Sequence, residues 1–248
     1  MKTIAVLGAG ITGVTTAAKL QKQGFDVTVI DRQRYAAMDT SFANGGQLSA
    51  SNAEVWNTWA TVLKGMKWML QSNAPLLVNP KPSWHKISWM LEFLRHIPNY
   101  ERNTITTAGL AIEARASLRA LAEDWKVDFD HSECGIMHFY SKNSEFNHAR
   151  KVTKLLAKAG LEREELSSAD VKTKEPNLKG DFVGGFWTPS DTTGDIHKFT
   201  YGLAAAIRKA GVKFMMETEL TDIKNESNGV RLTDSKGNEH ACDAVGVC

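Results

Sequence analysis

The 248-residue sequence contains only three cysteines, and it has no uninterrupted apolar run of the roughly 18 to 20 residues that span a bilayer. Cys134, Cys242 and Cys248 are odd in number and have neither metal-ligand nor redox-pair spacing. This argues against a disulfide framework and predicts reduced thiols in a cytosolic compartment. The seven histidines form no ligand motif. The sequence therefore predicts neither a metal site nor a membrane-spanning segment.

The sequence also lacks an excess of charge of one sign. Lys and Arg total 30 and Asp and Glu total 28, and the basic residues are scattered rather than gathered in one stripe. Composition therefore gives no reason to expect nucleic-acid binding. With 42% hydrophobic residues, a chain of this length can bury the core of one large α/β domain or of two closely associated ones.

The first 31 residues have a strand–helix–strand pattern. Residues 2–7 are an apolar, β-branched run too short for a helix, which indicates a strand buried on both faces. A glycine-rich turn follows, residues 12–23 carry a helical apolar stripe that Gly24 ends, and residues 26–30 indicate a second strand. The glycines also favour a phosphate-binding turn over a secretory signal, because they would weaken a helical signal core.

The middle of the chain has an α+β pattern. Residues 55–124 are predicted to be mostly helical, with the longest helix over 104–124. Strands are expected at 135–140 and 182–188, and a helix over 144–159 lies between them. Four prolines predict breaks between helical segments: Pro75, Pro80, Pro82 and Pro98.

The final third returns to alternating elements. We predict a helix over 197–210 that Gly211 ends, a strand over 212–218 and a hairpin over 229–242. Residues 243–248 begin another apolar strand, and the sequence stops within it without a loop or cap. This suggests that the domain is incomplete at its C-terminus.

The segment from Gly8 to Gly13, Gly-Ala-Gly-Ile-Thr-Gly, follows the first predicted strand and opens the first predicted helix. In a G-x-G-x-x-G motif the first glycine allows a tight turn, the second lets the backbone approach a pyrophosphate, and the third lets the helix pack on the strand. The helix N-terminus adds unpaired N–H groups and a positive dipole end. The alternative interpretation is a tight turn without a ligand.

Asp31 ends the second predicted strand, 18 residues beyond Gly13, where a carboxylate can accept hydrogen bonds from ribose hydroxyls and disfavours a 2′-phosphate. The alternative is that Asp31 caps a local turn. Because strand, glycines, helix, second strand and acid all occur in this order, we expect a dinucleotide ligand. NAD and FAD sites share the motif, so these residues do not separate the two.

A second polar, glycine-bearing segment covers residues 39–49, Asp-Thr-Ser-Phe-Ala-Asn-Gly-Gly-Gln-Leu-Ser. It can bring Ser41 and Asn44 to the pyrophosphate or ribitol. The backbone near Gly45 and Leu48 can approach a flat ring, because glycine allows contact too close for a side chain. The alternative interpretation is a surface loop rich in turn-forming residues.

Four segments carry a family resemblance: Gly-Ala-Gly-Ile-Thr-Gly, Val-Ile-Asp-Arg, Thr-Ser-Phe-Ala-Asn-Gly-Gly-Gln-Leu-Ser and Gly-Gly-Phe-Trp-Thr-Pro-Ser-Asp-Thr-Thr-Gly-Asp-Ile-His-Lys-Phe-Thr. The chain resembles, over essentially its whole length, the D-amino acid dehydrogenase small-subunit family within the D-amino acid oxidase-like flavoproteins. Many flavoproteins share the first two segments, whereas the third and fourth are more selective.

The resemblance implies a non-covalently held FAD. Its pyrophosphate would lie at the glycine motif, its adenosine ribose at Asp31 and its adenine end near Arg32, and the loop over 40–48 would run along the flavin. The strand over 212–220 would meet adenine, with Leu220 as the contact. The cofactor-binding residues implied in this way are Gly8, Gly10, Ile11, Thr12, Gly13, Asp31, Arg32, Ser41, Asn44, Gly45, Gln47, Leu48 and Leu220.

The reaction that the resemblance implies is oxidation of a D-amino acid at its α-carbon. Hydride passes to flavin N5, the imino acid hydrolyses to an oxo acid and ammonia, and the electrons go to a respiratory acceptor. Members of this family supply the cation for the substrate carboxylate mainly from beyond position 248. The catalytic residues are therefore unknown from this sequence.

The expected fold is α/β, with a Rossmann-like FAD-binding domain that has a mixed sheet and an α+β substrate domain, apparently truncated at the C-terminus. We assign residues 1–50 and 190–248 to the discontinuous FAD-binding domain. Residues 51–189 form the helical and α+β cap or substrate region.

Five tryptophans and four lysines gather between residues 56 and 89. One interpretation is an amphipathic surface on a membrane, where indoles and lysines favour the interface. The interpretation that we favour is that the tryptophans pack helices over the flavin domain. The residues concerned are Trp56, Trp59, Trp68, Trp84, Trp89, Lys64, Lys67, Lys81 and Lys86.

Asp191, Asp195 and His197 could be drawn as an acid/base cluster. We favour a structural role, because the Asp and Thr residues of 190–195 favour turns and Asp195 can N-cap the helix that follows.

Two alternative functions stay open. One is a glycine- or sarcosine-type amine oxidase that uses oxygen, and the other is a non-catalytic FAD-binding fragment or a subunit that needs a partner. For a D-amino acid dehydrogenase, the expected partner is a small-molecule amino-acid substrate. The expected location is the cytoplasm. A further expectation is peripheral association with the inner face of the cell membrane.

Overall fold

The first 31 residues form the predicted strand–helix–strand unit in a computed structural model, which describes residues 2–69, 71, 73 and 81–248. Strand β1 (Thr3–Leu7), helix α1 (Ile11–Lys22) and strand β2 (Asp26–Ile30) follow one another in the expected order. Val6 of β1 and Val27 and Val29 of β2 share one apolar core with the buried face of α1, where Val14, Ala17 and Ala18 lie.

The chain divides into two units. The first contains Met1–Leu48, Ala116–Cys134 and Thr192–Cys248, and the second contains Ser49–Arg115 and Gly135–Asp191. Residues 116–134 thus belong to the first unit and not, as the sequence analysis had it, to the substrate region. Leu118, Leu121 and Phe129 explain the difference, because they join the apolar core of the first unit.

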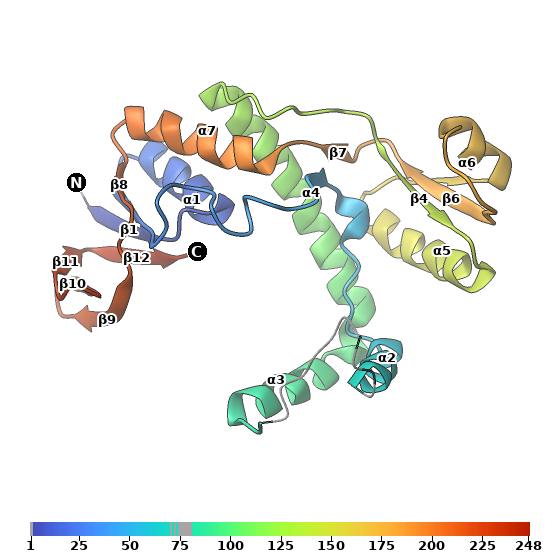
Figure 1. The fold of residues 1–248 in the computed structure, drawn as a ribbon, viewed down its shortest axis with the longest axis horizontal. Coiled ribbons are helices and arrows are strands. Elements are labelled where there is room, and N and C mark those ends of the chain that lie inside the picture. The colour runs from blue at the N-terminus through green and yellow to red at the C-terminus, as the bar shows by residue number, and fades with distance from the viewer. Residues whose placement is uncertain (1, 70, 72, 74–80) are drawn as a thin grey trace. The chain divides into compact units, whose positions relative to one another are not determined.

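A four-stranded parallel sheet forms the centre of the first unit (Figure 1). Its order is β12-β1-β2-β8, with β8 at Lys213–Met215 and β12 at Ala244–Val247. Helix α7 (Ile196–Lys209) packs against α1 and ends, as predicted, just before Gly211. The sequence analysis expected one mixed sheet. In the structure the parallel strands form this sheet, and the antiparallel strands of the unit form separate ones.

An antiparallel sheet of three strands completes the first unit. The predicted hairpin over 229–242 is confirmed as β10 (Gly229–Asp234) and β11 (Glu239–Cys242). Strand β9 (Leu220–Glu226) pairs with β10 and was not predicted, because most of its side chains are polar and exposed. In addition, β3 (Gln47–Leu48) pairs with β7 (Thr192–Thr193).

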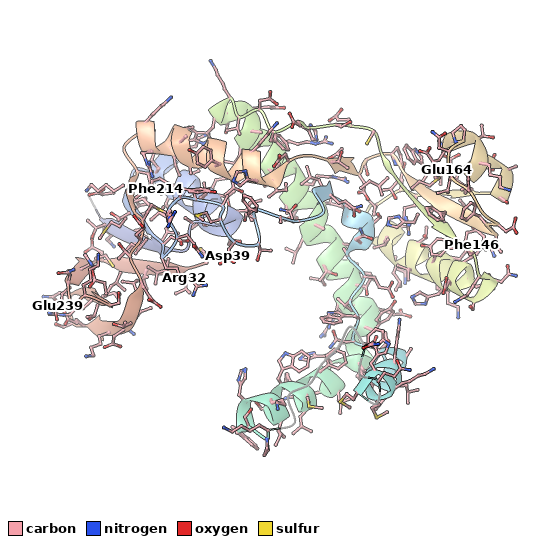
Figure 2. All side chains as sticks on the ribbon, viewed as in Figure 1. Arg32, Asp39, Phe146, Glu164, Phe214 and Glu239 are labelled. Carbon is pink, nitrogen blue, oxygen red and sulfur yellow. The ribbon has the colours of Figure 1, made fainter. Side chains whose placement is uncertain are left out.

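The second unit contains an antiparallel sheet of order β4-β6-β5. Its strands are β4 (Ile136–Tyr140), β5 (Glu164–Leu166) and β6 (Gly184–Thr188), and the first and third match predicted strands. Helix α5 (Asn143–Lys158) packs Phe146 against Phe186 of β6 (Figure 2). The short helix α6 (Ser168–Lys174) buries Val171 against the same sheet.

The remaining helices are α2 (Trp59–Met69), α3 (Trp84–Arg95) and α4 (Tyr100–Trp125), with short 3₁₀ turns at Ala50–Asn52 and Ile97–Asn99. The breaks predicted at Pro82 and Pro98 are confirmed, whereas Pro75 and Pro80 lie outside the described residues. Across the described part of the chain, no helix is both long and apolar enough to cross a bilayer.

Four of the five tryptophans of this region are exposed, whereas the interpretation that we favoured expected them to be packed between helices. Trp59 and Trp84 have exposed fractions of 62% and 78%, and Trp56 and Trp89 are also exposed. Helices α2 and α3, every residue of which is described, contain no buried residue.

Candidate functional site

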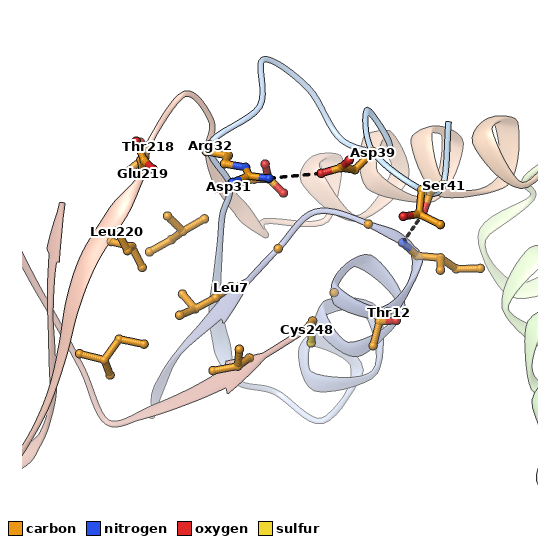
Figure 3. A pocket seen from close by; sticks show the side chains of 18 of the residues that line it. Leu7, Thr12, Asp31, Arg32, Asp39, Ser41, Thr218, Glu219, Leu220 and Cys248 are labelled. Atoms are coloured by element: carbon orange, nitrogen blue, oxygen red, sulfur yellow. Dashed lines mark hydrogen bonds and ion pairs between the residues drawn. The ribbon is translucent and has the colours of Figure 1, made fainter. Parts of the chain in front are cut away.

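A cavity of about 940 Å³ lies in the first unit at the C-terminal ends of β1 and β2 (Figure 3). This is the edge of a parallel sheet at which ligands bind in doubly wound folds. The predicted site residues that line the cavity are Gly8, Gly10, Ile11, Thr12, Gly13, Asp31, Arg32, Ser41, Asn44 and Leu220. The structure therefore brings most of the sequence-derived set together around one space.

The glycine turn has no room for side chains at two positions. Gly8 has φ +107°, and a Cβ there would lie 2.6 Å from the carbonyl oxygen of Cys248. At Gly13 a Cβ would lie 1.8 Å from the carbonyl oxygen of Gly8. These two glycines are therefore required by the close approach of the turn, β12 and α1, as the motif predicted.

Gly10 differs from these two glycines. A Cβ there would make only an ordinary contact, 3.5 Å from Oγ of Ser41, so packing within the chain does not require glycine. Gly10 N-caps α1, and the first intrahelical bond runs from the N–H of Val14 to its carbonyl. Gly10 and the first residues of α1 line the cavity, so a diphosphate there would make close backbone contact with the helix end.

The carboxylate of Asp31 is held by two backbone N–H groups. Oδ2 accepts a hydrogen bond from Ala9 at 2.6 Å, and Oδ1 accepts one from Gln33 at 2.7 Å. A carboxylate has about four acceptor positions, so both oxygens keep capacity for ribose hydroxyls. Asp31 lines the cavity, which is the condition that the dinucleotide interpretation requires.

Arg32 lies on the rim of the cavity (Figures 2 and 3). Its Nη2 is 3.6 Å from Oδ2 of Asp39, and both side chains are mostly exposed. An exposed pair of this kind contributes little to stability. The guanidinium can therefore be drawn to a ligand without a large loss of stability.

The loop over 39–48 divides into a part that lines the cavity and a part that does not. Ser41 is buried, and its Oγ accepts a hydrogen bond of 3.0 Å from the N–H of Ile11 at the start of α1. Asn44 stabilises the loop, because its Oδ1 accepts a hydrogen bond of 2.8 Å from the N–H of Gly46. Among the described residues, Gly45, Gln47 and Leu48 are not part of the lining.

Gln47 and Leu48 pair instead with the backbone of β7. Gly46, which was not selected from the sequence, approaches Gly194 closely: its carbonyl accepts the Gly194 N–H at 2.9 Å, and a Cβ would lie 2.7 Å from the Gly194 carbonyl oxygen. Gly46 thus lets two chain segments lie close together, a role that the sequence pattern alone did not reveal.

The wall opposite the glycine turn was largely missed by the sequence analysis. It consists of the end of the segment that joins β8 to β9 and of the first residues of β9, where Leu220 was the only predicted contact. The N–H of Thr218 donates to the carbonyl of Asp31, and the N–H of Glu217, which has φ +53°, donates to Gln33. Neither a motif nor an apolar pattern marks this segment. The missed lining residues of this wall are Thr218, Glu219, Thr221, Asp222 and Ile223.

Asp191 and Asp195 have structural roles, as predicted. Asp195 N-caps α7 by accepting the N–H of Lys198 at 2.9 Å. Asp191, in the second unit, is fully buried and accepts hydrogen bonds from Nη1 of Arg115 at 2.7 Å and from Oγ of Ser49 at 2.7 Å. The hydroxyl and N–H of Ser51 and the N–H of Ala50 complete its contacts.

A second cavity, of about 720 Å³, lies within the second unit. Arg163 lines it. Its Nη1 donates to Thr153, its Nε to Thr188 and its Nη2 to Nδ1 of His138. Because Arg163 can only donate, Nδ1 of His138 accepts and Nε2 donates to Oδ1 of Asn52. Burial lowers the pKa of His138, and the neighbouring guanidinium lowers it further, which agrees with a neutral ring.

Comparisons with known proteins agree with this geometry. The chain is 52% identical to D-amino acid dehydrogenase 3 of Mesorhizobium japonicum over 250 residues, covering all of this chain and 61% of the relative. It is 38% identical to a D-amino acid dehydrogenase of Dechloromonas aromatica, covering 94% of this chain and 58% of the relative. The chain thus spans about three fifths of the length of the curated relatives that it matches.

Among solved structures, glycine oxidase from Geobacillus kaustophilus has the same fold, with a TM-score of 0.71 at 20% identity over all of this chain and 55% of that one. The L-proline dehydrogenase of P. horikoshii has a TM-score of 0.65 at 18% identity, covering all of this chain and 52% of that one. The sequence profile of the FAD dependent oxidoreductases, DAO, matches residues 3–248. The chain therefore belongs to the DAO family of FAD-dependent oxidoreductases.

Proposed function

We propose that the whole protein is an FAD-dependent dehydrogenase that oxidises D-amino acids. The observation that carries the proposal is the 52% identity, over this entire chain, with a relative named D-amino acid dehydrogenase 3. Because the chain spans about three fifths of that relative, activity and substrate are proposed for the whole protein and not for residues 1–248 alone.

The residues of the first-unit cavity fit the parts of FAD. The N–H groups of Thr12 and Gly13 at the start of α1 would bind the diphosphate, with the positive end of the helix dipole behind them. Asp31 would accept hydrogen bonds from the adenosine ribose, while Arg32 and Leu220 would lie at the adenine end. The remaining proposed contacts, along the ribitol and flavin, are Ser41 and Asn44, which line the cavity, and Gly45, Gln47 and Leu48, which lie outside its lining.

Bound FAD would supply a hydride acceptor at flavin N5 for the α-carbon of the substrate. The first unit contributes binding and orientation. Asp31, itself anchored by the N–H groups of Ala9 and Gln33, would hold the ribose in one position along the sheet edge. Ser41 would hold the loop over 39–48 against the start of α1 through its bond to Ile11.

The substrate also requires a cation for its carboxylate and a pocket that orients the Cα–H bond. We propose that the second unit contributes to the substrate region, and that the cation comes from sequence beyond position 248. We assign no catalytic residue among the described residues. The imino product would hydrolyse to an oxo acid and ammonia, and the electrons would pass to a respiratory acceptor.

The test uses the full-length protein. Flavin absorbance bands in the purified protein, followed by reduction of an artificial acceptor with D- but not L-amino acids, would support the proposal. A full-length protein that shows no flavin bands, and that added FAD does not restore, would contradict it. A protein that binds FAD but oxidises no amino acid would instead fit a non-catalytic subunit that needs a partner.

A glycine- or sarcosine-type oxidase is the alternative within the same chemistry. It is supported by the fold that the chain shares with glycine oxidase, which at 20% identity is a likeness of fold alone. Oxygen consumption and peroxide formation distinguish the two, because a dehydrogenase should reduce an artificial acceptor while making little peroxide.

We propose in addition that the protein works in the cytoplasm, at the inner face of the cell membrane. A dehydrogenase that delivers electrons to a respiratory acceptor must meet that acceptor at the membrane. Fractionation of cells, with the dye-linked activity followed in the membrane and supernatant fractions, tests this location.

A further inference from the structure

Helices α2 and α3 present apolar side chains that nothing in the described part of the chain covers. Both helices are amphipathic, yet none of their residues is buried. Figure 1 shows them beside the N-terminal end of α4, away from the sheet of the second unit. The exposed apolar side chains of the two helices are Trp59, Leu63, Met66, Met69, Trp84, Ile87, Trp89, Met90, Leu91 and Leu94.

Each helix arranges most of these side chains in a stripe. In α2, Trp59, Leu63 and Met66 follow the spacing i, i+4, i+7. In α3, Trp84, Ile87, Leu91 and Leu94 follow the spacing i, i+3, i+7, i+10. Such spacing places the side chains on one face of a helix. We call the two stripes together the α2–α3 surface. Large apolar side chains that are exposed in groups mark interaction sites.

The charge around the α2–α3 surface indicates which kind of partner binds there. Between residues 56 and 96 the sequence has one acidic residue, Glu92, against five Lys and Arg residues, while the whole chain has a net charge of only +2. Glu92 pairs with Arg95 and His96. This segment is therefore strongly basic and the rest of the chain is slightly acidic, so the complementary partner carries negative charge.

Lysine and tryptophan together favour a lipid surface over a protein. Protein interfaces are depleted in lysine, whereas indoles and lysines are enriched where a helix lies in the headgroup region of a bilayer. Nζ of Lys64 lies 4.7 Å from the ring centre of Trp68, so a cation and an indole lie next to each other on α2. Helices of 11 and 12 residues are too short to span a bilayer, so they would lie in its interface.

We propose that the α2–α3 surface docks the protein on an anionic lipid bilayer. The apolar stripes enter the boundary between headgroups and acyl chains, and the flanking lysines, Lys64 and Lys67 among them, contact lipid phosphates. The inference rests on the membrane location proposed above, and it assigns that location to a particular surface.

The experiment measures co-sedimentation of the full-length, FAD-loaded protein with vesicles of phosphatidylcholine, with and without phosphatidylglycerol. We expect binding to the anionic vesicles that weakens as salt is added. The variant Lys64→Glu/Lys67→Glu should lower the partition coefficient by at least ~10-fold, because each basic residue near an anionic surface contributes roughly 5-fold. Leu91→Asn should lower it by roughly 10-fold through the loss of one buried leucine.

Matched controls come from helices of the same unit. Lys151→Glu/Lys154→Glu on α5 has the same spacing and exposed side chains, and Leu110→Asn on α4 replaces a leucine with a similar exposed fraction, 59% against 58% for Leu91. These controls should bind vesicles like the unmodified protein. Flavin absorbance of every variant reports whether it has folded.

Two results would overturn the proposal. One is full-length protein that stays in the supernatant with anionic vesicles. The other is an α2–α3 variant that changes the oligomeric state while its vesicle binding equals that of its control, since this would identify a protein as the occupant. Vesicle binding without D-amino acid oxidation would contradict only the proposed activity, and oxidation of a D-amino acid without vesicle binding would contradict only this inference.

Discussion

The carboxylate of Asp31 accepts a hydrogen bond of 2.6 Å from the main-chain N–H of Ala9. This contact connects the end of β2 to the glycine turn after β1, so the acid that would hold the ribose also fixes the turn that would hold the diphosphate. The two parts of the predicted dinucleotide site are therefore one hydrogen-bonded structure, and a change at Asp31 should affect both.

Asp31→Ala is expected to weaken FAD binding by roughly 10- to 100-fold, because hydrogen bonds to a charged group contribute about 1.5–3 kcal/mol. The apoprotein should also lose stability, since the N–H groups of Ala9 and Gln33 lose their acceptor. Titration of apoprotein with FAD measures the first effect and urea unfolding the second. Asp181→Ala, at an exposed position in the second unit, is the control and should leave FAD affinity unchanged. Equal affinities of the Asp31 variant and the control would contradict the assignment.

Two glycines of the turn should respond differently to alanine. Gly13→Ala is expected to disrupt the first unit, because its Cβ would overlap the carbonyl oxygen of Gly8 at 1.8 Å. Gly10→Ala should fold, since its Cβ has room beside Ser41, but FAD affinity should fall because the methyl group occupies space next to the diphosphate. Thermal unfolding and FAD titration separate the two effects.

Gly109→Ala is the control for the glycine variants. Gly109 lies in α4, where a Cβ would meet nothing within 4 Å, so this variant should keep both fold and FAD affinity. If Gly10→Ala bound FAD as tightly as Gly109→Ala, the diphosphate would not lie against this turn.

Arg115→Ala should destabilise the second unit. Asp191 is fully buried, and its ion pair with Arg115 is the charge that compensates it. Removing one partner of a buried pair typically costs about 3–5 kcal/mol, because the other charge stays buried without compensation. Arg150→Ala, which breaks a half-exposed pair with Glu165, is the control and should have little effect. If urea unfolding gave similar midpoints for Arg115→Ala and Arg150→Ala, this would contradict the role of Arg115 in compensating the charge of Asp191.

Asp234 predicts a pH dependence of stability. The side chain of Asn238 donates to its carboxylate and lowers the pKa of Asp234 to about 2, with further contributions from the N–H groups of Asn238 and Lys236 and from the His240 ring. A lowered folded-state pKa stabilises the protein above the unfolded-state value of 3.8, and this contribution disappears as the pH falls towards about 2.

The variant Asp234→Asn should therefore be less stable than the unmodified protein at pH 7, and the difference should shrink as the pH falls from about 4 to about 2. Urea midpoints measured across this range test the sign. Asp181→Asn, at an exposed position, is the control. A stability difference that stayed constant with pH would show that the Asp234 charge is not responsible.

Much of the fold could be predicted because its signals are local. The strand–helix–strand unit over the first 31 residues, the hairpin of β10 and β11 and the cap at Asp195 all depend on residues close together in sequence. Strand β9 was missed because its sequence, Leu-Thr-Asp-Ile-Lys-Asn-Glu, has few apolar residues, and its partner in the sheet is β10. A strand of this kind is defined by its hydrogen bonds and not by its hydrophobicity.

The tryptophans between residues 56 and 89 illustrate a second limit. The sequence analysis expected helical segments rich in tryptophan here, but apolar residues predict that a face will be covered and do not say by what. Only the structure showed that Trp56, Trp59, Trp84 and Trp89 are exposed within the described part of the chain.

The sequence by itself determined the ends of β1 and β2, the glycine turn and the acid at Asp31, because backbone sterics and short-range hydrogen bonds specify them. The tertiary structure decided which distant segments join them. It brought the segment after β8, through the Thr218 N–H, to the carbonyl of Asp31, and it directed Gln47 and Leu48 to β7 and away from the cavity lining. The physical reason is that these contacts join residues far apart in the chain, and their stability depends on the packing of the whole unit, which no local pattern records.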